Sequence, residues 1–189
     1  MIRAIIKNVT LELNSKPDLF SPDQIDKGTL AMLSVVDFSP NDKVLDLGCG
    51  YGVVGITAAK IIGSLNVVMS DIQEEAVIVA HENAVLNDVG DINIVLSDGF
   101  SNIHENNFSI ILSNPPYHSD FSVAKHFIEK GFNRLRLGGK MYMVTKRKDW
   151  YKNKFISIFG GVKIEEIGDY FIFCAEKRCV NYANVKRRK

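Results

Sequence analysis

The stretch VLDLGCGYG, residues 44–52, decides the fold of this chain. Its first four residues are mostly apolar and fit a short buried strand, and glycines follow at positions 48, 50 and 52. Glycine accepts positive φ and lets the backbone approach a ligand closely. The residues after the last glycine have helical spacing, so the stretch predicts a strand, a tight turn and a helix. We expect the turn to present free N–H groups, and the helix its positive dipole end, to a negative group.

Short β-rich runs alternate with longer segments of helical period on both sides of this stretch. This alternation is typical of a parallel sheet with crossover helices. The expected strands are 43–47, 65–70, 92–96, 108–113, 139–145, 162–167 and 170–176, and the expected helices are 29–36, 53–62, 74–87, 123–136 and 150–159. Only Gly168 and Asp169 separate the last two strands, which favours an antiparallel hairpin. The expected fold class is α/β, a Rossmann-like doubly wound seven-stranded sheet, mostly parallel with an antiparallel last strand.

The length of 189 residues fits one compact domain with a sizeable core. Residues 1–27, with an alternating apolar pattern near the start, are expected to form a short β-rich lead-in. Residues 28–180 would form the main domain, and residues 181–189 a basic C-terminal tail. This division is read from patterning alone.

Composition excludes several classes of protein. The chain is 46% hydrophobic and 24% charged, and it contains no apolar run long enough to cross a bilayer. Its N-terminus lacks the features of a secretory signal, so we expect no membrane association and a cytoplasmic location. Cys49, Cys174 and Cys179 form no C-x-x-C pair, which argues against a disulfide framework and against a metal site.

Charge is distributed unevenly along the chain. Residues 1–133 hold 8 Lys/Arg and 17 Asp/Glu, a balance of −9, whereas residues 134–189 hold 15 and 5, a balance of +10. The basic residues cluster at Lys146–Lys148 and at Lys186–Lys189. Clustered cations attract phosphate, so the C-terminal third favours a nucleic-acid partner, although a basic terminus is often only a solvated tail.

The glycine turn fits two kinds of ligand. Gly50, Gly52 and Gly55 match the spacing of a dinucleotide fingerprint, but counted from Gly48, where the turn begins, the match fails. Asp46 lies two residues before the first glycine, where it would repel a pyrophosphate and attract the ammonium group of an amino acid. S-adenosylmethionine carries that ammonium together with a carboxylate, and is therefore the expected cofactor.

Further acids close later strands. Asp71 ends the second expected strand and Asp98 follows the third. Ligands of open α/β sheets bind beyond the carboxyl ends of the strands. We expect Asp71 to accept hydrogen bonds from the ribose hydroxyls, Asp98 to accept one from the adenine amino group, and Ile72 to flank the ring. Each acid taken alone could equally be a helix cap or a solvated turn.

Asn114, Pro115, Pro116 and Tyr117 follow the fourth expected strand and are the candidate catalytic residues. The Asn114 carboxamide oxygen and the Pro115 carbonyl could hold the two N–H bonds of a planar NH2 group. The prolines fix the shape of the loop, and Tyr117 offers a face on which a flipped base or amide stacks. A rigid turn is the alternative, and His118 fits a turn position better than a catalytic one.

Lys27, Gly28 and Thr29 precede the core and are secondary candidates for covering the methionine end of the cofactor. The Thr29 hydroxyl or the backbone amides would make the contact. The alternative is a helix start with Asp26 as its cap.

In these motifs the chain resembles class I methyltransferases, over roughly residues 20–176. More narrowly, it resembles the small-domain type, the catalytic half of the RsmC-like enzymes that methylate guanine N2 in small-subunit ribosomal RNA. The resemblance implies a seven-stranded sheet, S-adenosylmethionine as cofactor and an RNA partner. The segments that carry it are Phe20-Ser21, Asp26–Thr29, Leu47–Gly55, Ser97–Phe100 and Ser113–His118.

From these motifs the resemblance also implies cofactor contacts by Gly48, Cys49, Gly50, Ser97 and Gly99. RsmC-like enzymes carry a second, degenerate copy of the domain, whereas this chain has one, which leaves the RNA target open. Glutamine methylation in a protein, adenine N6 methylation and a noncatalytic nucleic-acid-binding module are the alternatives.

Overall fold

The computed structural model describes residues 1–115 and 121–183. Its elements in chain order are β1 (Ile2–Ile6), β2 (Val9–Leu13), α1 (Lys27–Val35), β3 (Val44–Leu47), α2 (Val53–Ile62), the 3-10 turn η1 (Ser64–Asn66), β4 (Val67–Asp71), α3 (Glu74–Leu86), β5 (Asn93–Leu96), β6 (Phe108–Ser113), α4 (Ser122–Arg134), β7 (Leu135–Thr145), α5 (Asp149–Phe159), β8 (Lys163–Ile167) and β9 (Tyr170–Glu176).

Seven strands form one sheet in the order β5-β4-β3-β6-β7-β9-β8. Strands β3 to β7 pair in parallel, and β9 runs antiparallel to both β7 and β8. The chain reverses direction across the sheet between β3 and β6, which makes the carboxyl ends of these strands the topological switch point. The expected α/β class and the antiparallel last strand are confirmed.

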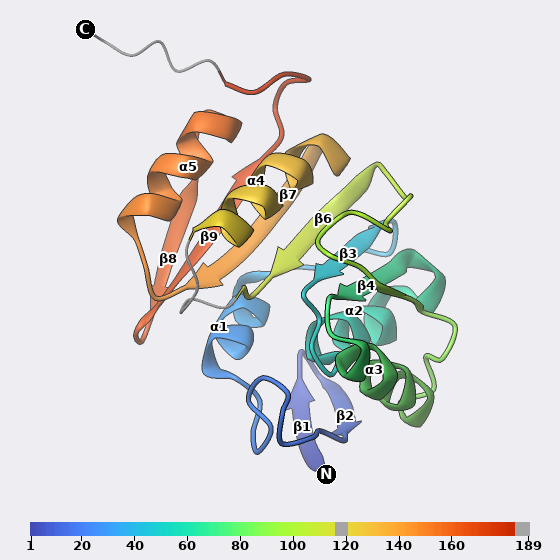
Figure 1. Cartoon of the computed structure of the whole chain (residues 1–189). Helices are drawn as coiled ribbons and strands as arrows, with labels where there is room; N and C mark the ends of the chain where they lie inside the picture. Colours follow the sequence, from blue (N-terminus) through green and yellow to red (C-terminus); the bar gives the residue numbers. More distant parts are fainter. Residues whose placement is uncertain (116–120, 184–189) are drawn as a thin grey trace, which may run out of the picture.

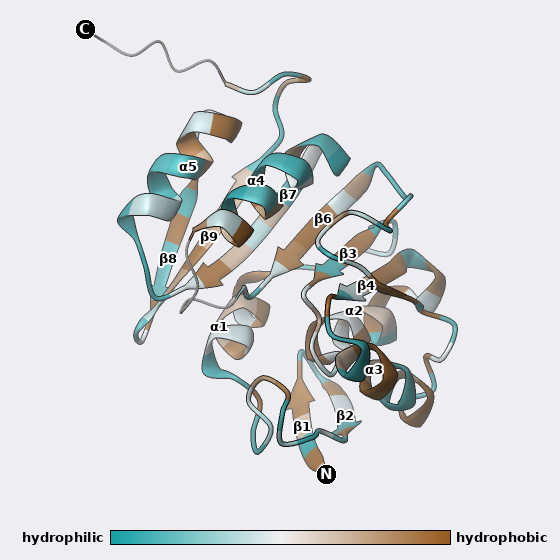
Figure 2. Cartoon of the chain, in the orientation of Figure 1, coloured by the Kyte–Doolittle hydropathy of each residue, from teal (hydrophilic) through white to brown (hydrophobic). Residues whose placement is uncertain are grey.

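Helices cover both faces of the sheet (Figure 1). One apolar cluster joins α1, α2 and α3 to one face, and a second joins α4 and α5 to the other. Figure 2 shows hydrophilic residues along the outer side of α4, the side turned away from the sheet. Most of the apolar side chains are therefore buried between the sheet and the two layers of helices that cover it.

The expected boundaries differ from the observed ones mainly at two places. The predicted strand start at Leu65 is wrong, because this side chain is 86% exposed in η1. The predicted helix end at residue 136 is also wrong, since α4 ends at Arg134 and β7 begins at Leu135. The pairing of β6 with β7 shifts register between Phe108 and Ile110, and this irregularity lets β7 begin early.

The lead-in forms the antiparallel hairpin β1–β2, as its alternating pattern predicts. Asn83 of α3 and Asn87, the C-cap of that helix, bind the free edge of the segment formed by β2 and Asn14 as a neighbouring strand would. Asn87 accepts from the Glu12 N–H and donates to the Glu12 carbonyl, and Asn83 does the same with Asn14. The hairpin is thereby fixed to α3, in the helix layer on one face of the main sheet. The division of the chain at residues 27 and 180 stays a prediction.

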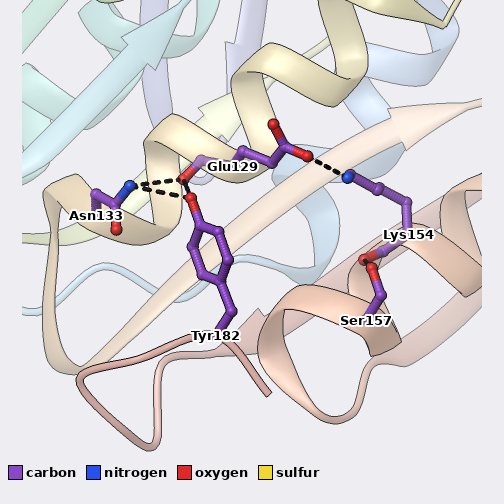
Figure 3. A network of polar contacts seen from close by, with 5 residues as sticks. All are labelled: Glu129, Asn133, Lys154, Ser157 and Tyr182. Atoms are coloured by element: carbon purple, nitrogen blue, oxygen red, sulfur yellow. Dashed lines mark hydrogen bonds and ion pairs between the residues drawn. The ribbon is translucent and has the colours of Figure 1, made fainter. Parts of the chain in front are cut away.

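The C-terminal segment packs against α4 and α5 (Figure 3). The Tyr182 hydroxyl donates to the Glu129 carbonyl and accepts from the Asn133 amide, both at 3.0 Å, and the Glu129 carboxylate pairs with Lys154. Because Asn133 lies near the point where α4 passes into β7, this contact sits at the amino ends of the strands. Across the residues that the structure describes, no helix has the length and apolar character that crossing a membrane requires.

Candidate functional site

A cavity of about 290 Å³ opens at the carboxyl ends of β3, β4, β5 and β6. Most of the predicted site residues with described positions line it. They are Thr29, Asp46, Gly48, Cys49, Gly50, Asp71, Ile72, Ser97, Asp98, Gly99, Asn114 and Pro115. The topology thus brings together side chains that lie far apart in the sequence.

The glycine turn is held by the end of β4. The N–H groups of Gly48 and Cys49 both donate to the Ser70 carbonyl at 2.9 Å, and the Gly50 N–H donates to Asp71 Oδ2 at 2.9 Å. The expectation of free N–H groups at these positions is therefore wrong, because the turn uses them internally. The positive φ of Gly48 and Gly50, 76° and 54°, shapes the cavity wall instead.

Asp46 is 2% exposed and its Oδ2 accepts from the Gly55 N–H at 2.8 Å. Burial raises the pKa of this carboxyl to about 7, while the Gly55 hydrogen bond lowers it and nearby Asp71 raises it further. Gly55 has no side chain, which lets α2 pack closely on Met69 of β4. A Cβ at this position would lie 2.4 Å from Met69 Cγ. A buried carboxylate on a cavity wall is set to bind a cation.

The acids at the ends of the next two strands are more accessible. Each carboxylate oxygen of Asp71 accepts one hydrogen bond, Oδ2 from the Gly50 N–H and Oδ1 from the Gln73 N–H at 3.0 Å. Both oxygens can accept a further hydrogen bond from a ligand. Asp98 is exposed at the cavity rim, and Ile72 is 64% exposed beside it. These positions suit a polyhydroxylated ligand with a flat apolar part.

Ser97 and Gly99 shape the turn after β5. The Ser97 hydroxyl donates to the Gly99 carbonyl at 2.9 Å and accepts from the Asn102 N–H at 3.0 Å, so its hydrogen bonds are local. Gly99 has φ +55°, and a Cβ there would lie 2.9 Å from the His126 ring of α4. Both residues thus act on the cavity through the backbone they position. Cys49 is buried, and burial raises the pKa of its thiol.

Asn114 is held in one orientation by Thr29 of α1 and by Asp26, the N-cap of that helix. Its Nδ2 donates to Asp26 Oδ1 at 2.7 Å and to Thr29 Oγ1 at 2.9 Å. Asp26 in turn accepts from the Thr29 N–H at 2.9 Å and from the Tyr170 hydroxyl at 3.3 Å. These contacts use the two N–H bonds of the amide and leave Asn114 Oδ1 buried without a hydrogen-bond partner in the described part of the chain. Such an acceptor costs about 1–3 kcal/mol.

The cap alternative for the start of α1 is realised, because Asp26 is its N-cap. Thr29 lines the cavity with its hydroxyl bound to Asn114, whereas Lys27 is exposed and neither Lys27 nor Gly28 lines the cavity. A Cβ at Gly28 would lie 2.6 Å from the Tyr170 ring, so this glycine serves packing. Pro115 lines the cavity; Pro116, Tyr117 and His118 lie outside the described residues.

Sequence reasoning did not place several lining residues. Two groups are involved, one from the segment before α1 and one from the strands and helices of the main domain and the turns that connect them. They are Leu19, Phe20, Ser21, Asp26, Leu47, Tyr51, Val53, Val54, Ser70, Gln73, Val123 and Phe127. The Phe20-Ser21 and Asp26 motifs carried part of the signal, but the apolar positions look like ordinary core. Among the described residues, no group of three or more His, Cys, Asp and Glu side chains could hold a metal ion.

A doubly wound sheet with an acid-lined cavity at its switch point and an asparagine at the end of β6 defines a methyltransferase fold of class I. The methyltransferase small domain family matches residues 10–173, and the chain belongs to this family.

Two curated relatives differ in length. Ribosomal RNA small subunit methyltransferase C of Psychromonas ingrahamii is 34% identical over 170 residues, covering 88% of this chain and 48% of that protein. Uncharacterized protein YbxB of Bacillus subtilis is 29% identical over 178 residues, covering 91% and 89%. The chain therefore spans about half the length of the methyltransferase C relative and most of the length of YbxB.

One solved structure shares nearly the whole fold. The 16S rRNA N2 methyltransferase RsmC of Thermus thermophilus, in complex with AdoMet and guanosine, superposes with a TM-score of 0.84 and 26% identity. The match covers 94% of this chain and 50% of that chain. The predicted resemblance to the small-domain methyltransferases is confirmed.

Proposed function

We propose that the chain is an S-adenosylmethionine-dependent N-methyltransferase that acts on the exocyclic amine, N2, of guanine in ribosomal RNA. The observation that carries the chemistry is Asn114, which lines the cavity and whose buried Oδ1 has no hydrogen-bond partner among the described residues. An acceptor in this state suits a ligand that brings an N–H donor. The N2 assignment draws on the similarity to the 16S rRNA N2 methyltransferase of Thermus thermophilus.

The cavity residues fit the proposed cofactor. Asp46 would face the ammonium group, Asp71 the ribose hydroxyls, and Asp98 the adenine amino group. The N-terminal residues of α2, Val53 and Val54, line the cavity, where the positive end of the helix dipole favours a carboxylate. When bound, S-adenosylmethionine supplies an electrophilic methyl group.

Asn114 would orient the nitrogen that receives the methyl group. The guanine amine is planar because its lone pair is delocalised into the ring. A hydrogen bond from this amine to Asn114 Oδ1, and a second to the Pro115 carbonyl, would fix its orientation. The positively charged methylated nitrogen can then lose a proton to water, so this mechanism requires no side-chain base. Orientation of this kind contributes roughly 7–11 kcal/mol in favourable cases.

The test is methyl transfer from labelled S-adenosylmethionine to 16S rRNA and small subunits, with protein extract in parallel. We expect label in RNA, recovered as N2-methylguanosine after hydrolysis. Failure to bind S-adenosylmethionine would refute the methyltransferase assignment. Label in protein alone would favour glutamine methylation, and label in adenosine would favour N6 methylation.

A substitution tests the role of Asn114. Asn114→Ala removes the acceptor, and we expect kcat to fall roughly 100-fold, as for loss of a preorganised polar contact. The affinity for S-adenosylmethionine, measured by calorimetry, should change little. The matched control is Asn133→Ala, because Asn133 is an exposed asparagine on α4. This substitution should leave kcat and the affinity for S-adenosylmethionine unchanged. Full activity of Asn114→Ala would contradict the proposed mechanism.

Placement of the protein in the cytoplasm stays a prediction.

A further inference from the structure

Two exposed cations follow the carboxyl end of β7, on the edge of the sheet where the cavity lies. They are Lys146 and Arg147. Neither takes part in an ion pair with a described carboxylate, whereas the next residue, Lys148, pairs with Glu166. Among the described residues, therefore, no carboxylate neutralises the charge of these two cations.

Arg147 lies over an aromatic pair. Its guanidinium carbon is 5.1 Å from the centroid of the Phe121 ring, and this ring stacks on Trp150 with centroids 4.3 Å apart and planes inclined by 13°. Phe121 and Trp150 are both only partly buried. Phe121 immediately precedes α4, and Val123, on the first turn of that helix, lines the cavity. A cation and a stacked aromatic pair thus adjoin the cavity wall.

Lys146 approaches the site from the other side. Its ammonium lies 4.9 Å from the centroid of the Tyr170 ring, and the Tyr170 hydroxyl donates to Asp26, which holds Asn114. The second cation is therefore separated from the Asn114 network by one aromatic ring. Partly exposed aromatic rings beside free cations are the usual composition of surfaces that bind single-stranded nucleic acid.

The fold turns the charge asymmetry of the sequence into an asymmetry in space. The cavity carboxylates Asp46, Asp71 and Asp98 belong to the acidic residues 1–133, which form β3, β4, β5 and β6. The basic segment, residues 134–189, forms β7, β8 and β9, which make up the other half of the same sheet (Figure 1). A polyanion would be repelled by the first half and attracted by the second.

We propose that Phe121, Lys146, Arg147 and Trp150 form a platform that binds single-stranded RNA flanking the nucleotide in the cavity. The proposal rests on the proposed function, because it takes RNA as the substrate. The cations contact phosphates, and the Phe121–Trp150 pair stacks an unpaired neighbouring base. A duplex offers no exposed base face, so the platform selects unpaired segments.

The natural sequence provides the reporter, since Trp150 is its one tryptophan. Titration with an unlabelled 12-nucleotide single-stranded RNA should quench tryptophan fluorescence and protect it from acrylamide. A hairpin duplex of equal charge should do neither at the same concentration. Trp150→Phe should keep the RNA affinity, measured by anisotropy with a labelled oligonucleotide, because a stacking face remains.

Three substitutions test the platform directly. Phe121→Leu keeps an apolar side chain but removes the aromatic face, and should weaken RNA binding about tenfold. Lys146→Gln and Arg147→Gln should each reduce the slope of log affinity against log salt by about 0.7, the value for one phosphate contact on a single strand. Arg136→Gln is the matched control, since this exposed residue lies near the other end of β7, roughly 30 Å away at about 3.3 Å per residue.

The outcomes separate the platform from the enzyme. If the wild type transfers methyl groups to RNA and the three variants bind RNA like Arg136→Gln, the platform is refuted and the proposed function stands. If the wild type modifies no RNA, the proposed function itself fails. Loss of binding in the three variants with unchanged affinity for S-adenosylmethionine would support the platform. Binding of a protein, and not of RNA, to this surface would refute it.

Discussion

At the scale of single residues, the proposed chemistry depends on the orientation of one amide, that of Asn114. The two ends of an asparagine side chain are nearly equal in shape, so its surroundings must decide which end faces the cavity. Here Asp26 and Thr29 take the Nδ2 end. The Asn114 Oδ1 is thereby left without a partner among the described residues, which the motif alone does not predict.

Asp26 is accordingly expected to act as a positioning residue. Asp26→Ala removes one acceptor for Asn114 and the N-cap of α1, so kcat should fall roughly tenfold while KM for S-adenosylmethionine stays nearly constant. The lost cap should also cost about 1 kcal/mol of stability. Asp26→Asn should restore kcat, because its amide oxygen can accept from the Asn114 amide and from the Thr29 N–H. A kcat unchanged in Asp26→Ala would show that Asn114 needs no such support.

Asp46 should make the protein sensitive to pH. Because burial raises the pKa of this carboxyl from 3.8 to about 7, the folded protein holds its proton more tightly than the unfolded chain does. The stability from this group is fully present below pH 3.8 and is lost as pH rises through about 7. Asp46→Asn should therefore raise the melting temperature more at pH 8 than at pH 5. Equal shifts at both values would contradict this assignment.

The same carboxyl should couple proton release to cofactor binding. An ammonium group beside Asp46 favours its ionised form, so binding of S-adenosylmethionine near pH 7 should release a proton. Calorimetry in buffers of different ionisation enthalpy measures this release, which Asp46→Asn should abolish. A release that persists in the variant would assign it to another group.

At the scale of elements, a side-chain bridge ties the lead-in hairpin to the cofactor side of the molecule. Asn83 Nδ2 donates to the Asn14 carbonyl at 2.9 Å and to the Tyr51 carbonyl at 2.8 Å, and its Oδ1 accepts from the Asn14 N–H. One fully buried side chain thus links β2, α3 and the glycine turn. The hairpin is expected to support the shape of that turn.

Asn83→Ala should therefore destabilise the whole domain. The variant leaves three backbone groups without their partner, and we expect a loss of roughly 2–4 kcal/mol in the free energy of unfolding, measured in urea. Asn133→Ala should cost far less, because its contact with Tyr182 is exposed. Equal costs would show that the Asn83 bridge adds no more stability than the exposed Asn133 contact does.

The elements were predictable where the chain marks their ends locally. Helix α2 was expected at 53–62 and occupies Val53–Ile62, because glycines bound it on both sides. The start of β4 was misplaced, since an apolar Leu65 is indistinguishable in sequence from a buried one. The partner of Asn114 could not be predicted, because Asp26 lies 88 residues away and meets it only through tertiary packing.

At the scale of the whole molecule, the two halves of the sheet should respond differently to salt. Raising the salt concentration from 50 to 200 mM should weaken RNA binding steeply and change the affinity for S-adenosylmethionine little. Phosphate binding depends on counterion release, whereas the cofactor has little net charge and its site is partly buried. Parallel calorimetric and anisotropy titrations measure both. Similar salt slopes would place the two ligands in one electrostatic environment.

The packing of Tyr182 against α4 also determines how the protein can be handled. This contact lies at the amino ends of the strands, whereas the cavity lies at their carboxyl ends. A molecule tethered to a sensor chip through its C-terminus should therefore present the cavity and the platform to the flowing solution. Ligand kinetics recorded in this orientation should match those in free solution.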